Sequence, residues 1–105
     1  MIKTKVINNV EYEIETHDFN KTLAEIQIPK GWRLLKPSEA MMLWERETFT
    51  SWFFVEQPLK NTKDVVRFDA NSYGAYLGCD WDATNVYSHL GVRFCRDLKE
   101  MKNEI

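Results

Sequence analysis

The sequence contains little of what marks export, membrane insertion or disulfide stabilisation. Its 105 residues include only two cysteines, three prolines and four glycines. Cys79 and Cys95 are too few for a disulfide framework and lack the C-x-x-C spacing of zinc and redox sites. Polar residues follow Met1, and no apolar run approaches the roughly 20 residues that cross a bilayer. We therefore expect no secretory signal, no membrane association and a cytoplasmic protein with reduced thiols.

The sequence also lacks a strong charge of either sign. Fourteen lysines and arginines against 16 aspartates and glutamates give a formal net charge of -2, which argues against a nucleic-acid partner. No G-x-G-x-x-G, P-loop or H-E-x-x-H pattern occurs, so we expect no nucleotide, zinc or other cofactor. His17 and His89 have no catalytic motif beside them, and we expect each of them in a loop.

Aromatic side chains are what the sequence has in excess. Four tryptophans, four tyrosines and six phenylalanines make up 13% of the chain, more than a core of this size hides easily. Apolar residues (44%) and charged residues (29%) are otherwise typical of a globular protein, and the length fits one domain over residues 1–105. We therefore expect a folded domain with some aromatic rings at its surface.

The first half of the chain predicts a hairpin and two helices. Alternating residues on either side of Asn8-Asn9 predict a β-hairpin over residues 3–15. Asp18 is a suitable N-cap for a helix over residues 18–27, with Phe19, Leu23 and Ile26 on one face. Pro37 and Ser38 open a second helix near residues 38–47, within a helical half that spans 18–47. Its buried stripe consists of Ala40, Leu43 and Trp44.

From residue 49 the apolar period changes to two, which predicts a sheet half over residues 49–98. Within it we expect a solvated loop at residues 60–64 and strands at 65–68, 75–79 and 91–96. The tail, residues 99–105, has no apolar period and is expected to fray. The element order predicts the α+β class, with two short helices packed on a twisted antiparallel sheet.

Three short motifs resemble one known family. Gly31-Trp32-Arg33-Leu34 with Pro37-Ser38-Glu39-Ala40 resembles a "GWRLPTeaE" element, although Leu35-Lys36 intervene where the family's proline follows directly. Residues 49–53 resemble the next strand, and residues 91–98 resemble a closing "GFR.vRD" strand. The resemblance covers residues 19–98 and is to the C-type-lectin-like fold. The matching branch is related to formylglycine-generating (sulfatase-modifying) enzymes and to phage variable receptor-binding domains.

The resemblance implies how the domain would pack and where it would bind. Two helices would cover the sheet, and the excursion at residues 70–90, before the last strand, would lie outside the core as a binding surface. The residues that would point inward from the sheet are Val66, Phe68, Leu77, Val92 and Phe94, with Trp32 and Trp44 sealing the helices onto it. A phage- or virus-encoded protein is the expected context, with a virion component as the alternative to a cytoplasmic one.

The function expected from these patterns is binding of a protein partner without catalysis. The excursion mixes rigid rings with small polar residues, the composition of recognition loops. The predicted contact residues are Tyr73, Tyr76, Asp80, Trp81, Asp82, Asn85 and Tyr87. Trp81 is the expected anchor, so Trp81→Ala should abolish partner capture and change stability little. The alternative for these rings is the margin of an aromatic-rich core.

Three other functions compete with this reading. The catalytic members of the family depend on paired cysteines, but Cys79 and Cys95 lie in apolar strands and are expected to be buried and inert. A structural subunit of a larger assembly is a second alternative. Asp80, Asp82 and Asn85 could also supply oxygen ligands to calcium, against the plainer reading of a solvated acidic loop, and no metal is expected.

Overall fold

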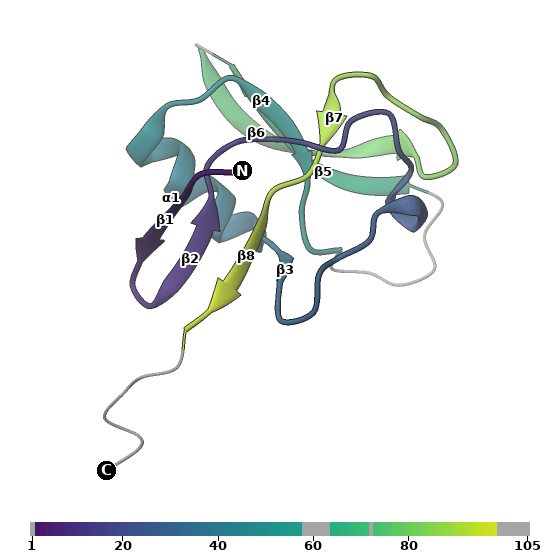
Figure 1. Cartoon of the computed structure of the whole chain (residues 1–105). Coiled ribbons are helices and arrows are strands. Elements are labelled where there is room, and N and C mark those ends of the chain that lie inside the picture. Colours follow the sequence, from purple (N-terminus) through teal and green to yellow (C-terminus); the bar gives the residue numbers. More distant parts are fainter. Residues whose placement is uncertain (1, 58–63, 72, 99–105) are drawn as a thin grey trace.

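Two four-stranded sheets and one α-helix make up the part of the chain that the computed structural model describes, residues 2–57, 64–71 and 73–98 (Figure 1). The strands are β1 (Thr4–Ile7), β2 (Val10–Glu13), β3 (Arg33–Leu34), β4 (Ser51–Phe54), β5 (Asp64–Asn71), β6 (Gly74–Asp82), β7 (Leu90–Gly91) and β8 (Phe94–Asp97). The helix is α1 (Pro37–Glu47), and a 3-10 turn, η1, spans Leu23–Glu25. The domain is therefore of the α+β class.

The first sheet joins the two ends of the described chain. Its strand order is β1-β2-β8-β3, and every pair in it is antiparallel. Asn8 and Asn9 have φ angles of 50° and 65°, the left-handed values that a two-residue hairpin turn requires. The hairpin predicted over residues 3–15 is confirmed, and it extends into this sheet through β2 and β8.

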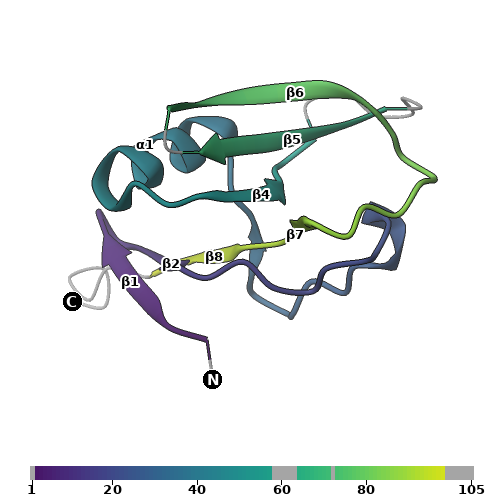
Figure 2. The same ribbon diagram turned by 90° about the horizontal axis from the view of Figure 1, so that it is seen from above.

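The second sheet carries the excursion. Its order is β6-β5-β4-β7, so β6 is an edge strand (Figure 2). β4, β5 and β6 pair antiparallel, but β7 runs parallel to β4, with Trp52 opposite Leu90. The expectation of a purely antiparallel sheet is wrong at this pair. The chain crosses the end of the sheet in residues 83–89 and rejoins it at the opposite edge, which a hairpin connection could not do.

Helix α1 begins and ends where its sequence predicts. Pro37 is the first helical residue, where its missing N–H costs nothing, and the backbone N–H of Lys36 donates to Glu39 Oε1 at 2.8 Å. Thr48 ends the helix with a φ of 47°, and its N–H donates to the Trp44 carbonyl at 2.7 Å. Ala40 and Leu43 are fully buried, so the helix predicted at 38–47 is confirmed.

The helix predicted at residues 18–27 is wrong, because only η1 forms there. Asp18 and Asn20 have φ angles of 55° and 64°, whereas a helix needs about -63°. The backbone N–H of Thr22 donates to Glu25 Oε1 at 2.8 Å, so the turn is capped at Thr22 instead of Asp18. Phe19 is consequently 40% exposed and does not lie on a helix face.

Two apolar clusters hold the described residues together, one on each face of the second sheet. The first lies beneath α1 and contains the fully buried Leu43, Phe53 and Phe68. The second contains Phe54, Val65, Leu90, Val92 and Phe94, with Trp32 and Trp81 packed against its margin. Figure 2 shows the loop of residues 83–89 at the end of the sheet away from α1.

Most residues predicted to face inward are buried, and Leu77 is the exception. Phe68, Val92 and Phe94 are at most 3% exposed, and Val66 is half-buried. Leu77 is 47% exposed, because β6 is the edge of the sheet and extends beyond the cover that α1 gives to its neighbours. Trp32 and Trp44 are half-buried at the margins of the two clusters. The predicted tail at 99–105, and residues 60–63 of the predicted loop, lie outside the described residues.

Candidate functional site

The seven residues predicted to contact a partner do not form one surface. Tyr73 lies in the turn of the β5–β6 hairpin and Tyr76 near the start of β6, at the end of the sheet close to α1, whereas Trp81, Asp82 and the loop that follows lie toward the other end of β6 (Figure 2). Tyr76 and Trp81 are five residues apart in β6, which at roughly 3.3 Å each is about 16 Å, and Tyr73 lies farther still from Trp81. Asp80 belongs to β6, but its side chain is not among those described. The candidate site must therefore be treated as two surfaces.

The hairpin tip presents large side chains to solvent. Asn71 Oδ1 accepts hydrogen bonds from the backbone N–H groups of Tyr73 (2.8 Å) and Gly74 (3.1 Å), which fixes the turn. Tyr73 is 98% exposed, and Tyr76 and Leu77 are 53% and 47% exposed. Tyr73, Tyr76 and Leu77 are together called the tip surface below, with Tyr76 and Leu77 on opposite faces of β6 because they are consecutive residues that pair with Asp69 and Phe68.

Four rings gather around Trp81. Trp81 stacks on Tyr87 with 4.2 Å between ring centroids and a 27° tilt. Trp52 of β4 lies 5.2 Å from Trp81, and the His89 ring meets Trp52 edge-on at 4.6 Å. Such offset and edge-to-face geometries are the favourable ones for aromatic pairs. Trp52, Trp81, Tyr87 and His89 are called the ring cluster below.

A buried arginine completes the packing of Trp81. Arg67 of β5 is only 5% exposed, its Nε lies 3.1 Å from Asp69 Oδ1, and its Cζ lies 3.8 Å from the centre of the Trp81 ring. Tyr87 and the guanidinium cannot both lie about 4 Å above the same face of one ring, so they cover opposite faces. Trp81 is therefore sandwiched, which leaves only its edge exposed.

A β-bulge and a glycine make this sandwich possible. Arg67 pairs with Gly78, but Val65 pairs with Trp81, so β6 has one more residue than β5 between these two pairs. The bulge puts Gly78 and Trp81 on the same face as Arg67 although they are three residues apart. A Cβ on Gly78 would lie 2.4 Å from Arg67 Cζ. Any larger residue would force the guanidinium to shift from this position.

Hydrogen bonds among polar residues fix the conformation of the loop after β6. Asp82 Oδ1 accepts hydrogen bonds from the backbone N–H and the hydroxyl of Thr84, at 2.8 and 2.7 Å. The backbone N–H of Asn85 donates to the Asp82 carbonyl at 3.2 Å. Asp82 and Asn85 are exposed. No group of three or more histidine, cysteine or acidic side chains suited to a metal ion occurs among the described residues.

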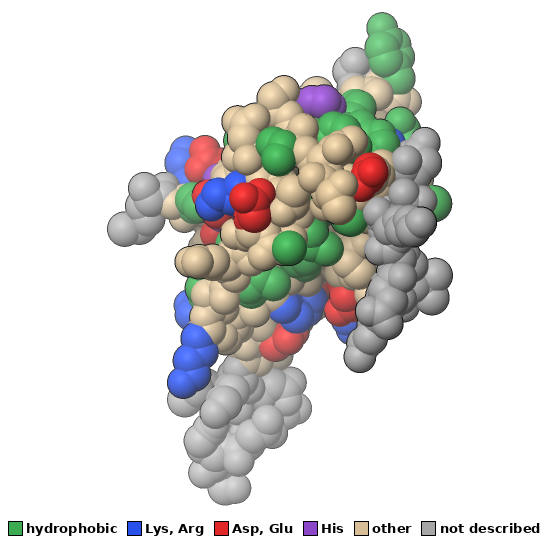
Figure 3. Space-filling model, turned by 90° about the vertical axis from the view of Figure 1, so that its right-hand side faces the viewer, with side chains coloured by type: hydrophobic (Ala, Val, Ile, Leu, Met, Phe, Trp, Pro, Cys, Tyr) green, Lys and Arg blue, Asp and Glu red, His purple; other side chains and the backbone are tan. Residues whose placement is uncertain are grey.

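A hollow of about 260 Å³ opens beside the ring cluster. It is lined by Phe19, Thr50, Ser51, Trp52 and His89, which come from three separate segments of the chain. The Ser51 hydroxyl is hydrogen-bonded to that of Thr16, which ties the β4 side of the hollow to the segment before Phe19. Figure 3 shows hydrophobic side chains and a histidine exposed near the upper edge of the face that carries the 83–89 loop.

Sequence reasoning missed the residues that surround Trp81. The sequence predicts a strand that contains Trp52, a loop that contains His89 and a strand over 65–68 that contains Arg67, and it gives no sign that the three lie together. In the sheet, Trp52 pairs with Asp69 and Asp69 pairs with Tyr76, so the three residues lie side by side across β4, β5 and β6. This alignment depends on how the strands pair in the fold, which local sequence patterns do not show. The local signal for Arg67 was a glycine, Gly78, in an otherwise regular strand pattern.

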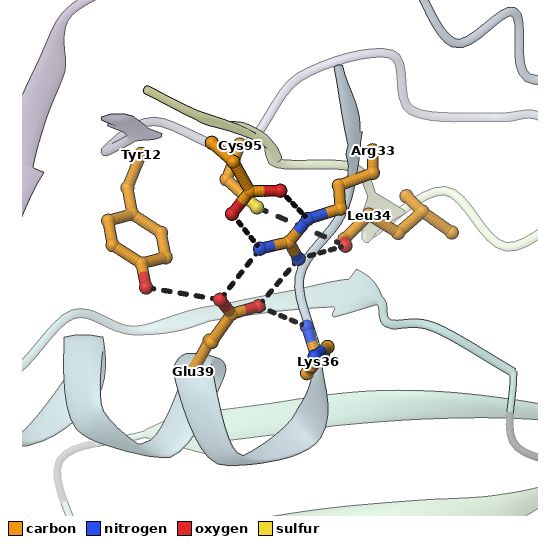
Figure 4. Close-up of polar contacts among 7 residues, drawn as sticks. Tyr12, Arg33, Leu34, Lys36, Glu39 and Cys95 are labelled. Atoms are coloured by element: carbon orange, nitrogen blue, oxygen red, sulfur yellow. Dashed lines mark hydrogen bonds and ion pairs between the residues drawn. The ribbon is translucent and has the colours of Figure 1, made fainter. Parts of the chain in front are cut away.

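A charged network joins the motif segments on the far side of the molecule (Figure 4). Arg33 makes two hydrogen bonds to Glu39, at 2.8 and 2.9 Å, and two to Asp97, at 3.1 and 3.0 Å. The Tyr12 hydroxyl donates to Glu39 Oε2 at 3.3 Å. Burial alone would raise the pKa of Glu39, but the bonds from Arg33 and Lys36 bring that pKa below its ordinary value. The network ties β3, α1, β8 and β2 together.

The two cysteines lie in different sheets and differ in exposure. Cys95 is fully buried in β8, and burial raises the pKa of its thiol to about 12, as expected for an inert side chain. Cys79 is exposed, so the expectation that both thiols are buried is wrong for Cys79. The cause is the edge position of β6 and the bulge at this residue. Neither forms a disulfide.

Comparison with known proteins adds no relative. No helix among the described residues is long and apolar enough to cross a membrane. No protein-family model matches the chain, and no curated protein or solved structure matches it either. The assignment of function therefore rests on the geometry of the tip surface, the ring cluster and the hollow.

Proposed function

We propose that this protein is a small binding domain without catalytic activity and that its ligand is another protein. The observation that carries the proposal is a concentration of exposed apolar side chains. Seven large hydrophobic residues are exposed among the described part of the chain, and four of them, Tyr73, Tyr76, Leu77 and Val86, fall within residues 73–86. Val86 lies in the loop after β6, but the other three are close together at the hairpin tip, and exposed apolar groups that lie close together are typical of protein–protein contact sites.

The position of the tip surface supports the same conclusion. It lies at the start of β6, whose outer edge has no neighbouring strand among the described residues. An edge strand offers unpaired backbone groups to an extended segment of a partner, while exposed side chains such as Tyr76 and Leu77 add specificity. The bulge at Cys79–Asp80 would limit such pairing to the first half of β6.

The finer fold assignment also belongs to this proposal. Arg33 and Glu39 come from the first motif that resembles the C-type-lectin-like fold, and Asp97 comes from the last. The four hydrogen bonds of Arg33 give these motif positions a common structural role. We therefore favour a C-type-lectin-like domain over an unrelated α+β arrangement. An experimental structure with a different strand order from the one described would remove this support.

Site-specific photocrosslinking tests the binding function. A photoreactive phenylalanine analogue placed at Tyr73 or at Leu77 is exposed to an extract of the source cells, and crosslinked proteins are identified by mass spectrometry. Ile28, which is 46% exposed and lies outside the 73–86 segment, is the matched control position. We expect one partner protein to crosslink from both tip positions and not from Ile28.

A substitution then separates binding from folding. Leu77→Ser should reduce capture of that partner at least tenfold, and it should leave thermal stability close to that of the wild type because Leu77 is half-exposed. Equal crosslinking from Ile28 would mean non-specific adhesion and would contradict the proposal. Crosslinks solely to a second copy of the chain would replace a partner protein with self-association.

A further inference from the structure

We propose that the hollow beside the ring cluster receives one neutral aromatic side chain of the partner protein. This inference rests on the proposed function and names the chemistry of one contact within it. The hollow is lined by Phe19, Thr50, Ser51, Trp52 and His89. None of the predicted contact residues is among them, so the site is additional to those expected from the sequence.

The size of the hollow fits a single ring. Its volume is about 260 Å³. An enclosed apolar cavity of about 150 Å³ already holds benzene, whereas pockets for drug-sized ligands measure roughly 300–1,000 Å³. One ring with its substituent therefore fits the hollow. An isolated ring binds weakly on its own, so such a site is useful as an anchor point within a wider interface.

The charges around the hollow favour a neutral occupant. Its lining contains no acidic side chain, and the only titratable residue in it is His89. A cation would be attracted to the tryptophan faces, but Arg67 already lies 3.8 Å from the Trp81 ring and 5.9 Å from the Trp52 ring. Arg67 therefore already occupies the Trp81 ring face that a second cation would need, and no carboxylate of the lining offers that cation an ion pair. Lysine and arginine side chains are therefore disfavoured.

The rings that line the hollow are held in place before a ligand arrives. Trp52 packs against Trp81 at 5.2 Å and against His89 at 4.6 Å, and Trp81 is itself fixed between Arg67 and Tyr87. A ring that is already ordered loses little conformational entropy on binding. The hydroxyl groups of Thr50 and Ser51 on the same rim offer hydrogen-bonding partners to a phenol or an indole N–H.

Titration with side-chain mimics tests this inference on the whole protein. We would follow the backbone amide signals by NMR during addition of p-cresol, a tyrosine mimic, and of n-butylammonium, a lysine mimic. We expect p-cresol to shift the signals of Thr50, Ser51, Trp52 and His89 with a millimolar dissociation constant, and n-butylammonium to leave them in place. No shift with p-cresol, or an equal response to n-butylammonium, would overturn the inference.

A pair of matched variants makes the test specific. Phe19→Ala removes one wall of the hollow, and because Phe19 is 40% exposed and outside both buried clusters the fold should persist. Ile28→Ala removes an apolar group of similar exposure elsewhere. We expect the dissociation constant of p-cresol to rise at least threefold in Phe19→Ala and to stay unchanged in Ile28→Ala. Equal effects of the two variants would overturn the inference.

The two proposals fail in different ways. If the crosslinked partner is captured through the tip surface but p-cresol does not bind at the hollow, the ring receptor is wrong and the binding domain stands. If p-cresol binds at the hollow but no partner crosslinks from either tip position, the proposed function is wrong and a partner side chain cannot be the occupant.

Discussion

Replacing Trp81 with alanine should destabilise the domain, because the ring covers a buried charge. The sequence alone predicts that Trp81 anchors a partner and contributes little to stability. In the fold, one face of the ring lies over the Arg67 guanidinium at 3.8 Å and the other stacks on Tyr87 at 4.2 Å. Trp81→Ala would open a path for water to Arg67 and Asp69, which are 5% and 1% exposed.

The size of the effect follows from these contacts. A partly desolvated cation–π contact contributes about 1–2 kcal/mol, and an aromatic pair about 0.5–1.5 kcal/mol beyond its buried area. A fully buried tryptophan replaced by alanine costs about 3–5 kcal/mol, and Trp81 is only half-buried. We therefore expect a loss of about 2–3 kcal/mol, against a total stability of about 5–15 kcal/mol for a domain of this length. The melting temperature should fall by roughly 10–15 °C.

Thermal and urea unfolding followed by circular dichroism measure this change. Tyr73→Ala is the control, since Tyr73 is 98% exposed and its loss should change the unfolding free energy by less than about 0.5 kcal/mol. A double-mutant cycle of Trp81→Ala with Arg67→Met should give a coupling energy of about 1 kcal/mol. If Trp81→Ala is as stable as the wild type, the ring does not support Arg67, and its role as a partner anchor returns.

Three further substitutions or treatments follow from the geometry. Gly78→Ala should lower the free energy of unfolding in urea by about 1–3 kcal/mol, because the alanine Cβ would lie 2.4 Å from Arg67 Cζ. A variant as stable as the wild type would show that the guanidinium moves aside freely. The pKa of Glu39 is lowered in the folded state, so its stabilising effect is present above its ordinary pKa of 4.5 and is lost as pH falls through the folded value. Glu39→Gln should therefore be less stable at pH 7 and show a weaker loss of stability in acid, and an unchanged acid profile would contradict the role of this network. A thiol reagent should label Cys79 rapidly and Cys95 only on unfolding, since Cys79 is exposed and Cys95 is fully buried. Mass spectrometry identifies the labelled thiols, and labelling of both in the native state would refute the burial of Cys95.

Local patterns predicted the elements whose cause is local. The hairpin depends on Asn8 and Asn9, which adopt left-handed angles at little cost, and α1 depends on Pro37 and an apolar stripe through Ala40 and Leu43. The helix at residues 18–27 failed for the opposite reason. Its apolar spacing is helical, but His17 is bound to Val92 through two backbone hydrogen bonds, and the chain turns at Asp18 to allow this. That constraint comes from the last part of the chain.

The candidate site also has one part that the sequence could predict and one part that it could not. The exposure of Tyr73 could be predicted, because the residues around it have no apolar period and Asn71 favours a turn. The ring cluster could not, because it depends on the register of β4, β5 and β6 and on the bulge in β6. A one-residue change in that register would move Trp81 to the opposite face of the sheet, away from Arg67. Gly78 is the one local sign of the bulge, and a glycine alone does not fix the register of the strands.

Whether an aromatic ring can anchor a partner depends on how much of its two faces is uncovered. By this criterion the order of the candidate anchor residues differs from the order that their sequence context predicts. Trp81 stands among polar residues, yet both of its faces are covered. Tyr73 is 98% exposed, so its whole ring is accessible, although ordering it on binding costs conformational entropy. Trp52 lies in a strand that the sequence does not mark as a binding site, yet it lines the hollow and is held by Trp81 and His89.

A rigid, partly open ring gains the most free energy when it is covered, so Trp52→Ala should weaken partner capture more than Tyr73→Ala does. Because Trp52→Ala also removes part of the second cluster, Phe19→Ala is the variant that separates lost binding from lost stability. If Phe19→Ala leaves capture unchanged and Tyr73→Ala abolishes it, the tip surface alone carries the interaction.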